Sequence, residues 1–176
     1  MKNYLLCIIL VLITVCTYAQ IIFIPDPNFK AALMAYSPSI DLNNDKEIQF
    51  SEARVVRSLD IRNKYIQNLL GIEFFTALVG LDCSSNRLTY LDVSKNTALT
   101  YVICEDNQLA TLNVNMNTSL AILDCSNNQI TTLDVSRNTA LTNLSCDNNQ
   151  LATLDVTKTL YCIPWDAIPT NCPHWI

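Results

Sequence analysis

The segment ILDCSNNQITTLDVSRNTALT, residues 122–142, is one of four similar units that follow one another along the chain. The other three are LDCSSNRLTYLDVSKNTALT at 81–100, YVICEDNQLATLNVNMNTSLA at 101–121 and the shorter NLSCDNNQLATLDV at 143–156. Their cysteines stand 21 residues apart, at Cys83, Cys104, Cys125 and Cys146. A fixed period of about 20–50 residues predicts stacked coils, because no single coil can bury its apolar face alone. Function in such a stack lies on a surface.

Each unit combines a short strand pattern with an asparagine. Leu123 and Cys125 are separated by one residue, which is the alternation of a strand with one buried face. Stacking would set these strands side by side in a parallel sheet. An asparagine three residues after each cysteine is expected to satisfy backbone groups of its own turn and of the next coil. These asparagines are Asn86, Asn107, Asn128 and Asn149. A weaker second copy, Leu133-x-Val135-x-x-Asn138, predicts an extended return side without a full helix.

The pattern Leu-x-x-Leu-x-Cys-x-x-Asn-x-Leu, which residues 120–130 follow with isoleucine at the last position, resembles the leucine-rich repeat. The resemblance implies an α/β fold: a right-handed leucine-rich repeat solenoid, dominated by strands, with a short helical N-terminal cap and little or no helix in the repeats. Residues 59–78 form an earlier, degenerate unit with Ile61 at the cysteine position. The expected domains are a signal peptide at 1–19, an N-terminal cap at 20–58, the repeats at 59–159 and a C-terminal cap at 160–176.

The first residues have the composition of a signal peptide. Lys2 gives a short basic start, residues 4–16 are an apolar run, and residues 17–19 fit a small-residue cleavage site. A membrane anchor is one alternative, although the run is short for a bilayer. A lipoprotein with Cys16 as its lipid acceptor is another, although Val15 is larger than that site usually takes. The prediction is a chain exported to the cell envelope (surface or periplasm) or secreted, without membrane insertion after signal removal.

Charge and composition restrict the function of the exported chain, which is expected to start at Gln20. Removing Lys2 from the 11 basic residues leaves 10 against 16 acidic residues, a balance of −6. An acidic chain of this kind is a poor ligand for nucleic acid or anionic lipid. His174 is the single histidine, and the sequence has no Ser-His-Asp arrangement, phosphate loop or metal-ligand cluster. The sequence therefore predicts that the protein is not an enzyme.

The cysteines fall into two groups. The column of four in the repeats is expected to consist of buried thiols in an apolar core, the alternative being metal or redox chemistry. The sequence has no CxxC pair to support that alternative. Cys162 and Cys172 lie outside the column. In an exported chain they are expected to form a disulfide that closes the C-terminal cap, the alternative being two simply buried cysteines.

Residues 41–52, DLNNDKEIQFSE, resemble a calcium loop of the EF-hand type. Its candidate ligands are Asp41, Asn43, Asp45, the backbone carbonyl of Glu47, and Glu52. Lys46 stands where the usual glycine makes a sharp turn with positive φ, which lysine tolerates poorly. The alternative is an acidic cap loop in which Asp41 or Ser51 caps a helix. A bound calcium would stabilise the cap, and no other cofactor is expected.

The segments IPDPNFKAAL (24–33), DLNNDKEIQFSEA (41–53), DCSNNQITTLDVSRNTAL (124–141) and LYCI (160–163) together make the chain similar to secreted leucine-rich repeat proteins of the internalin-like bacterial kind. The similarity is greatest to those of Bacteroidetes with 21-residue repeats. It implies recognition of another protein by the concave face of the solenoid.

Most outward strand positions on this face carry small or acidic residues. Tyr101, Ile103 and the neighbouring Ile122 instead form an apolar cluster, with Glu105 and Asp124 on its acidic rim, as is typical of a binding hot spot. The rim favours a basic protein partner. The alternatives are ordinary surface variation, or a structural envelope or matrix component without a discrete partner.

The return side carries regular polar rows. One row is Tyr90, Thr111, Thr132 and Thr153, and the row beside it is Asp92, Asn113, Asp134 and Asp155. Such rows are expected to be solvated, although they also make a glycan a candidate ligand.

Overall fold

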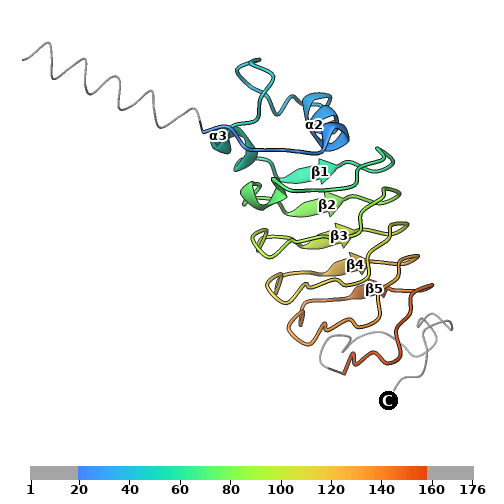
Figure 1. Cartoon of the computed structure of the whole chain (residues 1–176). Coiled ribbons are helices and arrows are strands. Elements are labelled where there is room, and N and C mark those ends of the chain that lie inside the picture. Colours follow the sequence, from blue (N-terminus) through green and yellow to red (C-terminus); the bar gives the residue numbers. More distant parts are fainter. Residues whose placement is uncertain (1–19, 158–176) are drawn as a thin grey trace, which may run out of the picture.

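In residues 20–157, which a computed structural model describes, five short strands lie side by side in one parallel sheet (Figure 1). They are β1 (Ser58–Asp60), β2 (Gly80–Asp82), β3 (Tyr101–Ile103), β4 (Ile122–Asp124) and β5 (Asn143–Ser145). The strands pair residue for residue, so that Leu81 stands opposite Val102 and Val102 opposite Leu123. Equivalent positions of successive repeats therefore form straight rows across the sheet.

The middle residue of each strand points into the core. Leu81 and Val102 are fully buried, and the cysteines two positions later, Cys83 and Cys104, are fully buried as well. This is the alternation expected of a strand with one packed face. The predicted fold class, a strand-dominated leucine-rich repeat solenoid with little helix, is confirmed.

The return side of the coils is built mainly from turns. A short 3₁₀ helix, η1 (Ile72–Phe74), lies in the first coil. Among the described residues of the later coils, the strand-like pairing on this side is a single parallel bridge between Asp92 and Asn113. The extended return side predicted from the sequence is thus present only in part, because each coil has to reverse its direction within a few residues.

An asparagine after each cysteine joins one coil to the next. The Asn107 amide nitrogen donates to the carbonyls of Cys83, Cys104 and Glu105, each at 3.1 Å, and its oxygen accepts the Leu88 N–H at 2.9 Å. Asn86, Asn128 and Asn149 repeat the donor pattern. Buried backbone groups need such partners. Each asparagine thus satisfies backbone groups of its own turn, as predicted, and its partners in the neighbouring coil belong to the preceding coil rather than to the next one.

A second row of asparagines joins the coils on the return side, at Asn96, Asn117 and Asn138. Each is fully buried, and each amide nitrogen donates to two carbonyls of the preceding coil. The coils are therefore bonded to one another on both sides of the apolar core.

We predict that Asn107→Ala lowers the free energy of unfolding by about 1–3 kcal/mol or more, because it leaves several buried backbone groups without partners. The measurement is chemical denaturation followed by circular dichroism. Thr118→Ala, at an exposed turn position of the same solenoid, is the control and should change stability by less than about 0.5 kcal/mol. Similar losses in both variants would contradict a special role for the asparagine.

The N-terminal cap covers the first coil with two helices, α2 (Pro27–Met34) and α3 (Phe50–Ala53) (Figure 1). Asp26 caps α2 by accepting the N–H groups of Asn28 and Phe29, and its other oxygen accepts those of Gln67 and Asn68 in the first coil. Burial acts to raise the pKa of Asp26, but the four hydrogen bonds outweigh it and hold the pKa below its usual value. One carboxylate thus fastens the cap to the solenoid.

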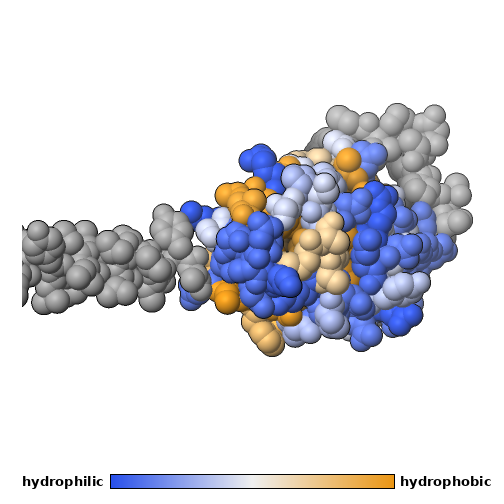
Figure 2. Space-filling view, turned by 90° about the horizontal axis from the view of Figure 1, so that it is seen from above, coloured by the Kyte–Doolittle hydropathy of each residue, from blue (hydrophilic) through white to orange (hydrophobic). Residues whose placement is uncertain are grey.

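Seen from above, the cap end shows apolar patches between hydrophilic areas (Figure 2). Exposed apolar side chains of the cap include Ile21, Phe23, Leu42 and Val55. Within residues 20–157, none of the helices has the length and apolar composition needed to cross a membrane. The expected signal peptide at 1–19, the whole C-terminal cap at 160–176 and the Cys162–Cys172 disulfide lie outside the described residues.

Candidate binding surface on the sheet

The outward strand positions and the second position after each strand form a surface that we call the sheet face. It is the surface expected to be concave from the resemblance. Its residues are Ser58, Asp60 and Arg62, then Gly80, Asp82 and Ser84, then Tyr101, Ile103 and Glu105, then Ile122, Asp124 and Ser126, and finally Asn143, Ser145 and Asp147. The strand register fixes which of them are neighbours.

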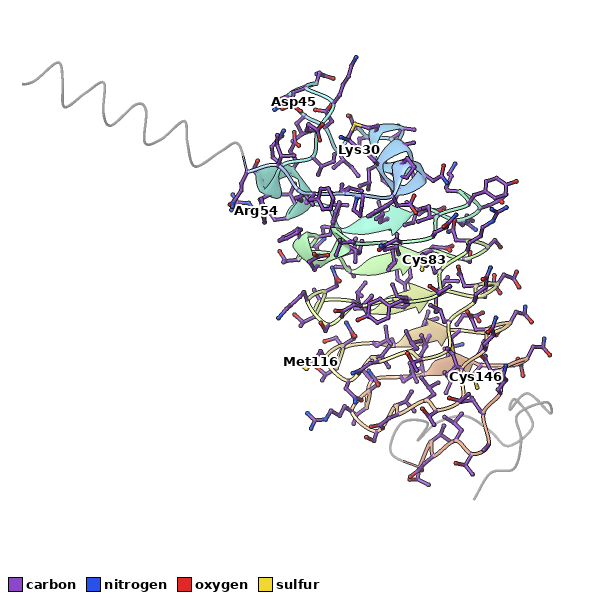
Figure 3. The ribbon with its side chains drawn as sticks, viewed as in Figure 1. Lys30, Asp45, Arg54, Cys83, Met116 and Cys146 are labelled. Carbon is purple, nitrogen blue, oxygen red and sulfur yellow. The ribbon has the colours of Figure 1, made fainter. Side chains whose placement is uncertain are left out.

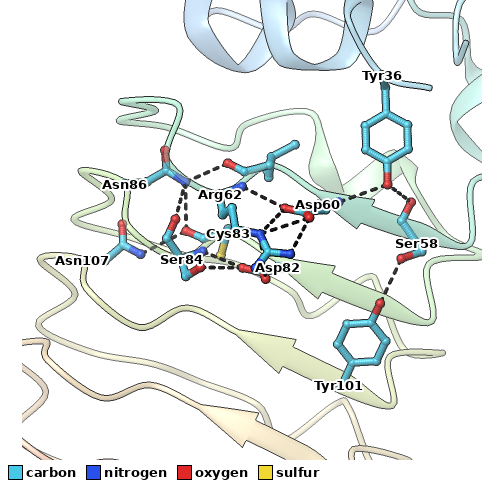
Figure 4. A network of polar contacts seen from close by, with 11 residues as sticks. Tyr36, Ser58, Asp60, Arg62, Asp82, Cys83, Ser84, Asn86, Tyr101 and Asn107 are labelled. Atoms are coloured by element: carbon cyan, nitrogen blue, oxygen red, sulfur yellow. Dashed lines mark hydrogen bonds and ion pairs between the residues drawn. The ribbon is translucent and has the colours of Figure 1, made fainter. Parts of the chain in front are cut away.

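Tyr101 lies across the neighbouring strand and is held there. Its hydroxyl is 2.9 Å from Ser58 Oγ, two strands away (Figure 4). Its ring lies over Gly80. A Cβ atom at Gly80 would stand 1.9 Å from the Tyr101 ring carbon Cζ. The Tyr36 hydroxyl donates to the Ser58 carbonyl at 3.0 Å and accepts the Asp60 N–H at 3.2 Å. The sequence suggested an exposed tyrosine, whereas the structure shows a half-buried one whose position is fixed from the cap.

Ile103 and Ile122 complete the apolar cluster beside Tyr101. In register, Tyr101 pairs with Ile122, and Ile103 stands between Asp82 and Asp124. Ile103 is half-buried, while 43% of Ile122 is exposed. The structure thus brings the three residues together on one surface, with Ile122 the most accessible of them.

Carboxylates border this cluster, and they differ in their partners. Asp82 accepts the Ser84 N–H and hydroxyl and lies 3.6 Å from the Arg62 guanidinium. Asp124 accepts the Ser126 N–H and hydroxyl, both on Oδ1. Asp82 is buried as well as charge-compensated, although it occupies an outward strand position.

Glu105 is half-buried among other carboxylates. Burial raises its pKa, and the negative charges of Asp124, Asp106 and Asp82 raise it further. None of the ion pairs in residues 20–157 involves Glu105 or Asp124. This part of the sheet face carries negative charge that the solenoid itself does not compensate.

Gly80, Ser58, Tyr36 and Arg62 shape this surface, and the sequence reading gave them no role. One signal was available. The chain has only two glycines. In the row of Gly80, the later repeats have the larger residues Tyr101, Ile122 and Asn143. A glycine in a strand often marks the close approach of another group.

The cysteine column is part of the core. Cys83 and Cys146 lie beyond the strands on one flank of the stack, and Met116 lies at the opposite flank (Figure 3). All four cysteines are buried, which confirms that part of the prediction. Burial raises the pKa of the Cys83 thiol to about 12 and that of Cys104 well above its ordinary value. Buried thiols of this kind are chemically inert, because the reactive form is the thiolate.

The loop that resembles a calcium site makes the sharp turn that such a site needs. Lys46 has φ 68° and Asn44 has φ 59°, so lysine at the sixth position does not prevent the turn. Asp41 accepts the N–H groups of Asp45 and Lys46, at 3.2 Å and 3.0 Å. Asp45 Oδ1 accepts the Glu47 N–H at 2.9 Å. These bonds hold the loop in a closed turn.

The candidate ligand oxygens of this loop already have other partners. Glu52 accepts the N–H groups of Leu42 at 2.8 Å and Gln49 at 2.9 Å, and so caps α3. The Glu47 carboxylate, which is not the candidate ligand atom of that residue, pairs with Lys30 at 2.6 Å. Within residues 20–157, no three His, Cys, Asp or Glu residues are grouped so that they could hold a metal ion. The residue types suit calcium, but an ion would have to compete with these bonds.

We predict that introducing Ala at Gly80 destabilises the protein by about 1–3 kcal/mol, because the new methyl group displaces the Tyr101 ring. The same substitution in a Tyr101→Ala background should cost much less, since no ring then lies over the site. Denaturation of the wild type, both single variants and the double variant measures this coupling. Equal losses of stability in the two backgrounds would show that the Tyr101 ring does not restrict the size of the side chain at position 80.

The calcium prediction has a separate test. Free calcium at ten times its dissociation constant should raise the free energy of unfolding by about 1.4 kcal/mol relative to a chelator. Asp41→Ala should abolish this increase, and magnesium at the same concentration is the control for ionic strength. A melting temperature that does not respond to calcium would mean that the loop serves only as a cap.

Internalins are among the known proteins that are similar to this chain in sequence and fold. No protein-family model matches the chain. Internalin J of Listeria monocytogenes serotype 4b (strain F2365) is 38% identical over 73 residues, which are 42% of this chain and 8% of that protein. The solved functional domain of InlJ from Listeria monocytogenes, which includes a cysteine ladder, has a TM-score of 0.68 and 39% identity, and the match covers 76% of this chain and 29% of that chain.

A second solved structure shares the fold. The internalin InlF of Listeria monocytogenes has a TM-score of 0.62 and 18% identity, with 76% of this chain and 46% of that chain covered. The present chain spans less than half the length of each of these proteins. The match shows a shared fold, while the activities of the longer proteins do not follow from it. The described part of this chain is an internalin-like leucine-rich repeat solenoid.

Proposed function

We propose that the protein is a non-catalytic, exported binding module that holds another protein on its sheet face. The observation that carries this proposal is the cluster of Tyr101, Ile103 and Ile122. Elsewhere the sheet face presents small or polar residues, whereas this cluster presents contiguous apolar surface in its middle. Exposed apolar clusters with a polar rim are typical of protein interfaces.

The fixed position of Tyr101 supports the same function. Ser58 and Gly80 hold the ring in one place before any partner arrives. A side chain that is already ordered loses little conformational entropy on binding, so more of the contact energy appears as affinity. The uncompensated carboxylates Glu105 and Asp124 favour a partner with basic residues.

The proposal also covers where the protein is located and which kind of internalin-like protein it is. We place the protein in the cell envelope or the medium, as one of the secreted internalin-like proteins of the Bacteroidetes type. Catalysis is not part of the proposal, because the carboxylates of the sheet face are spread over successive coils along an open surface. Calcium, if the loop of Asp41 binds it, would have a structural role in the cap.

A glycan is the second candidate ligand, and one feature of the return side favours it. A hollow of about 460 Å³ lies there, lined by Thr111, Asn113, Thr132, Asp134 and other residues of three successive coils. Hydroxyl, amide and carboxylate groups in such a hollow suit sugar hydroxyls. A structural envelope component without a discrete partner is the remaining alternative.

The test is capture of partners from envelope and extracellular extracts by the chain from Gln20 onward. An Ile103→Thr, Ile122→Thr variant removes apolar surface but keeps branched side chains that suit strands. A Val55→Thr, Met116→Thr variant changes two other exposed apolar residues and is the matched control. A protein held by the wild type and the control, but lost by the Ile103/Ile122 variant, supports the proposal. Equal capture by all three would place the interface elsewhere.

A further inference from the structure

In the first two coils of the sheet face, an arginine lies beside two carboxylates, whereas the third and fourth coils have the carboxylates without such a cation. Asp60 and Asp82 stand opposite each other in β1 and β2. The Arg62 guanidinium lies beside both, at 2.7 Å from Asp60 and 3.6 Å from Asp82 (Figure 4). One arginine of the chain thus compensates two carboxylates on neighbouring strands.

Two coils further on, carboxylates gather in the same way without a cation. The row that begins with Arg62 continues through Ser84 to Glu105, so a glutamate stands in the row where the first coil has the arginine. Glu105 lies close enough to Asp124 and Asp82 for their charges to act on it. Asp124 Oδ1 accepts both hydrogen bonds from Ser126. Oδ2 is therefore the oxygen that we expect to meet a partner.

An apolar side chain lies between these carboxylates. Ile103 is half-buried, pairs in register with Asp124, and precedes Glu105 by two residues on the same face. Long basic side chains lay their aliphatic stems on apolar surface and keep their charged ends with acidic groups. A guanidinium also has the forked geometry that lets it contact more than one carboxylate oxygen.

We infer that the sheet face recognises an arginine of its protein partner, whose stem lies on Ile103 and whose guanidinium lies between Glu105 and Asp124. This inference rests on the proposed function and names the chemistry that the partner must present at that site. The partner's arginine would do in the third and fourth coils what Arg62 does in the first two.

The probe is the peptide acetyl-Gly-Arg-Gly-amide, titrated into the ¹⁵N-labelled chain and followed by NMR. Saturable shifts are expected at residues 103–105 and 124–126. The same peptide with citrulline in place of arginine keeps the shape and removes the charge, and it should bind at least about fivefold more weakly. Equal shifts with both peptides, or shifts that map elsewhere, would overturn the inference.

Charge variants locate the site. Glu105→Gln with Asp124→Asn should weaken arginine binding about fivefold or more. Asp92→Asn with Asp134→Asn removes two charges from the return side and should leave binding unchanged. The fold of the first variant is expected to persist, because Glu105→Gln relieves like-charge repulsion and the amide oxygen introduced by Asp124→Asn can still accept from Ser126. Equal weakening in both pairs would indicate only a general effect of net charge.

The pH dependence provides a further readout. Lowering the pH through the raised pKa of Glu105 neutralises this carboxylate, which lies near Asp82, Asp106 and Asp124. Arginine binding should therefore weaken towards acid pH in the wild type and depend less on pH in Glu105→Gln. An unchanged profile in that variant would contradict a contact with Glu105. If a captured partner fails to bind the Ile103→Thr, Ile122→Thr variant but binds the Glu105→Gln, Asp124→Asn variant as well as it binds the wild type, the proposed function stands and this inference fails.

Discussion

The amide bonds of the buried asparagines are the interaction on which the rest of the structure depends. Asn107 satisfies carbonyls of its own coil and of the coil before it, and Asn117 bonds to the preceding coil on the return side. Without these bonds the turns would bury unpaired backbone groups, since each coil has few backbone partners inside itself. Each coil is therefore complete only when its neighbour is present, and stability is shared between neighbouring coils.

This dependence also determines how the surface is made. Because asparagines and apolar rows hold every coil in the same register, the outward positions can carry different residues from coil to coil. Gly80 and Tyr101 are an example of such a difference. The absence of a side chain at Gly80 in β2 makes room for the ring of Tyr101 from β3. The cap takes part as well, since Tyr36 contacts Ser58, which in turn holds Tyr101.

The sequence predicted the features that every coil shares. Strands, register, buried cysteines and the role of the asparagines all follow from periodicity. It also indicated which residues face outward, but not which of them are covered. Asp82 is buried because Arg62 and Ser84 reach it, and the direction of such side chains is not contained in the repeat. At Lys46, the local cost of positive φ suggested a poor turn, yet the hydrogen bond to Asp41 holds it.

In the function that we propose, the differences between coils, and not the features they share, determine where a partner binds. In the first two coils Arg62 satisfies Asp60 and Asp82, so a partner has little to gain there. In the third and fourth coils Glu105 meets only like charges beside a half-buried Ile103. A basic side chain placed at that point would relieve repulsion and cover apolar surface in one contact. A solenoid can keep this local imbalance because its stability comes from the rows beneath the surface, which the imbalance does not touch.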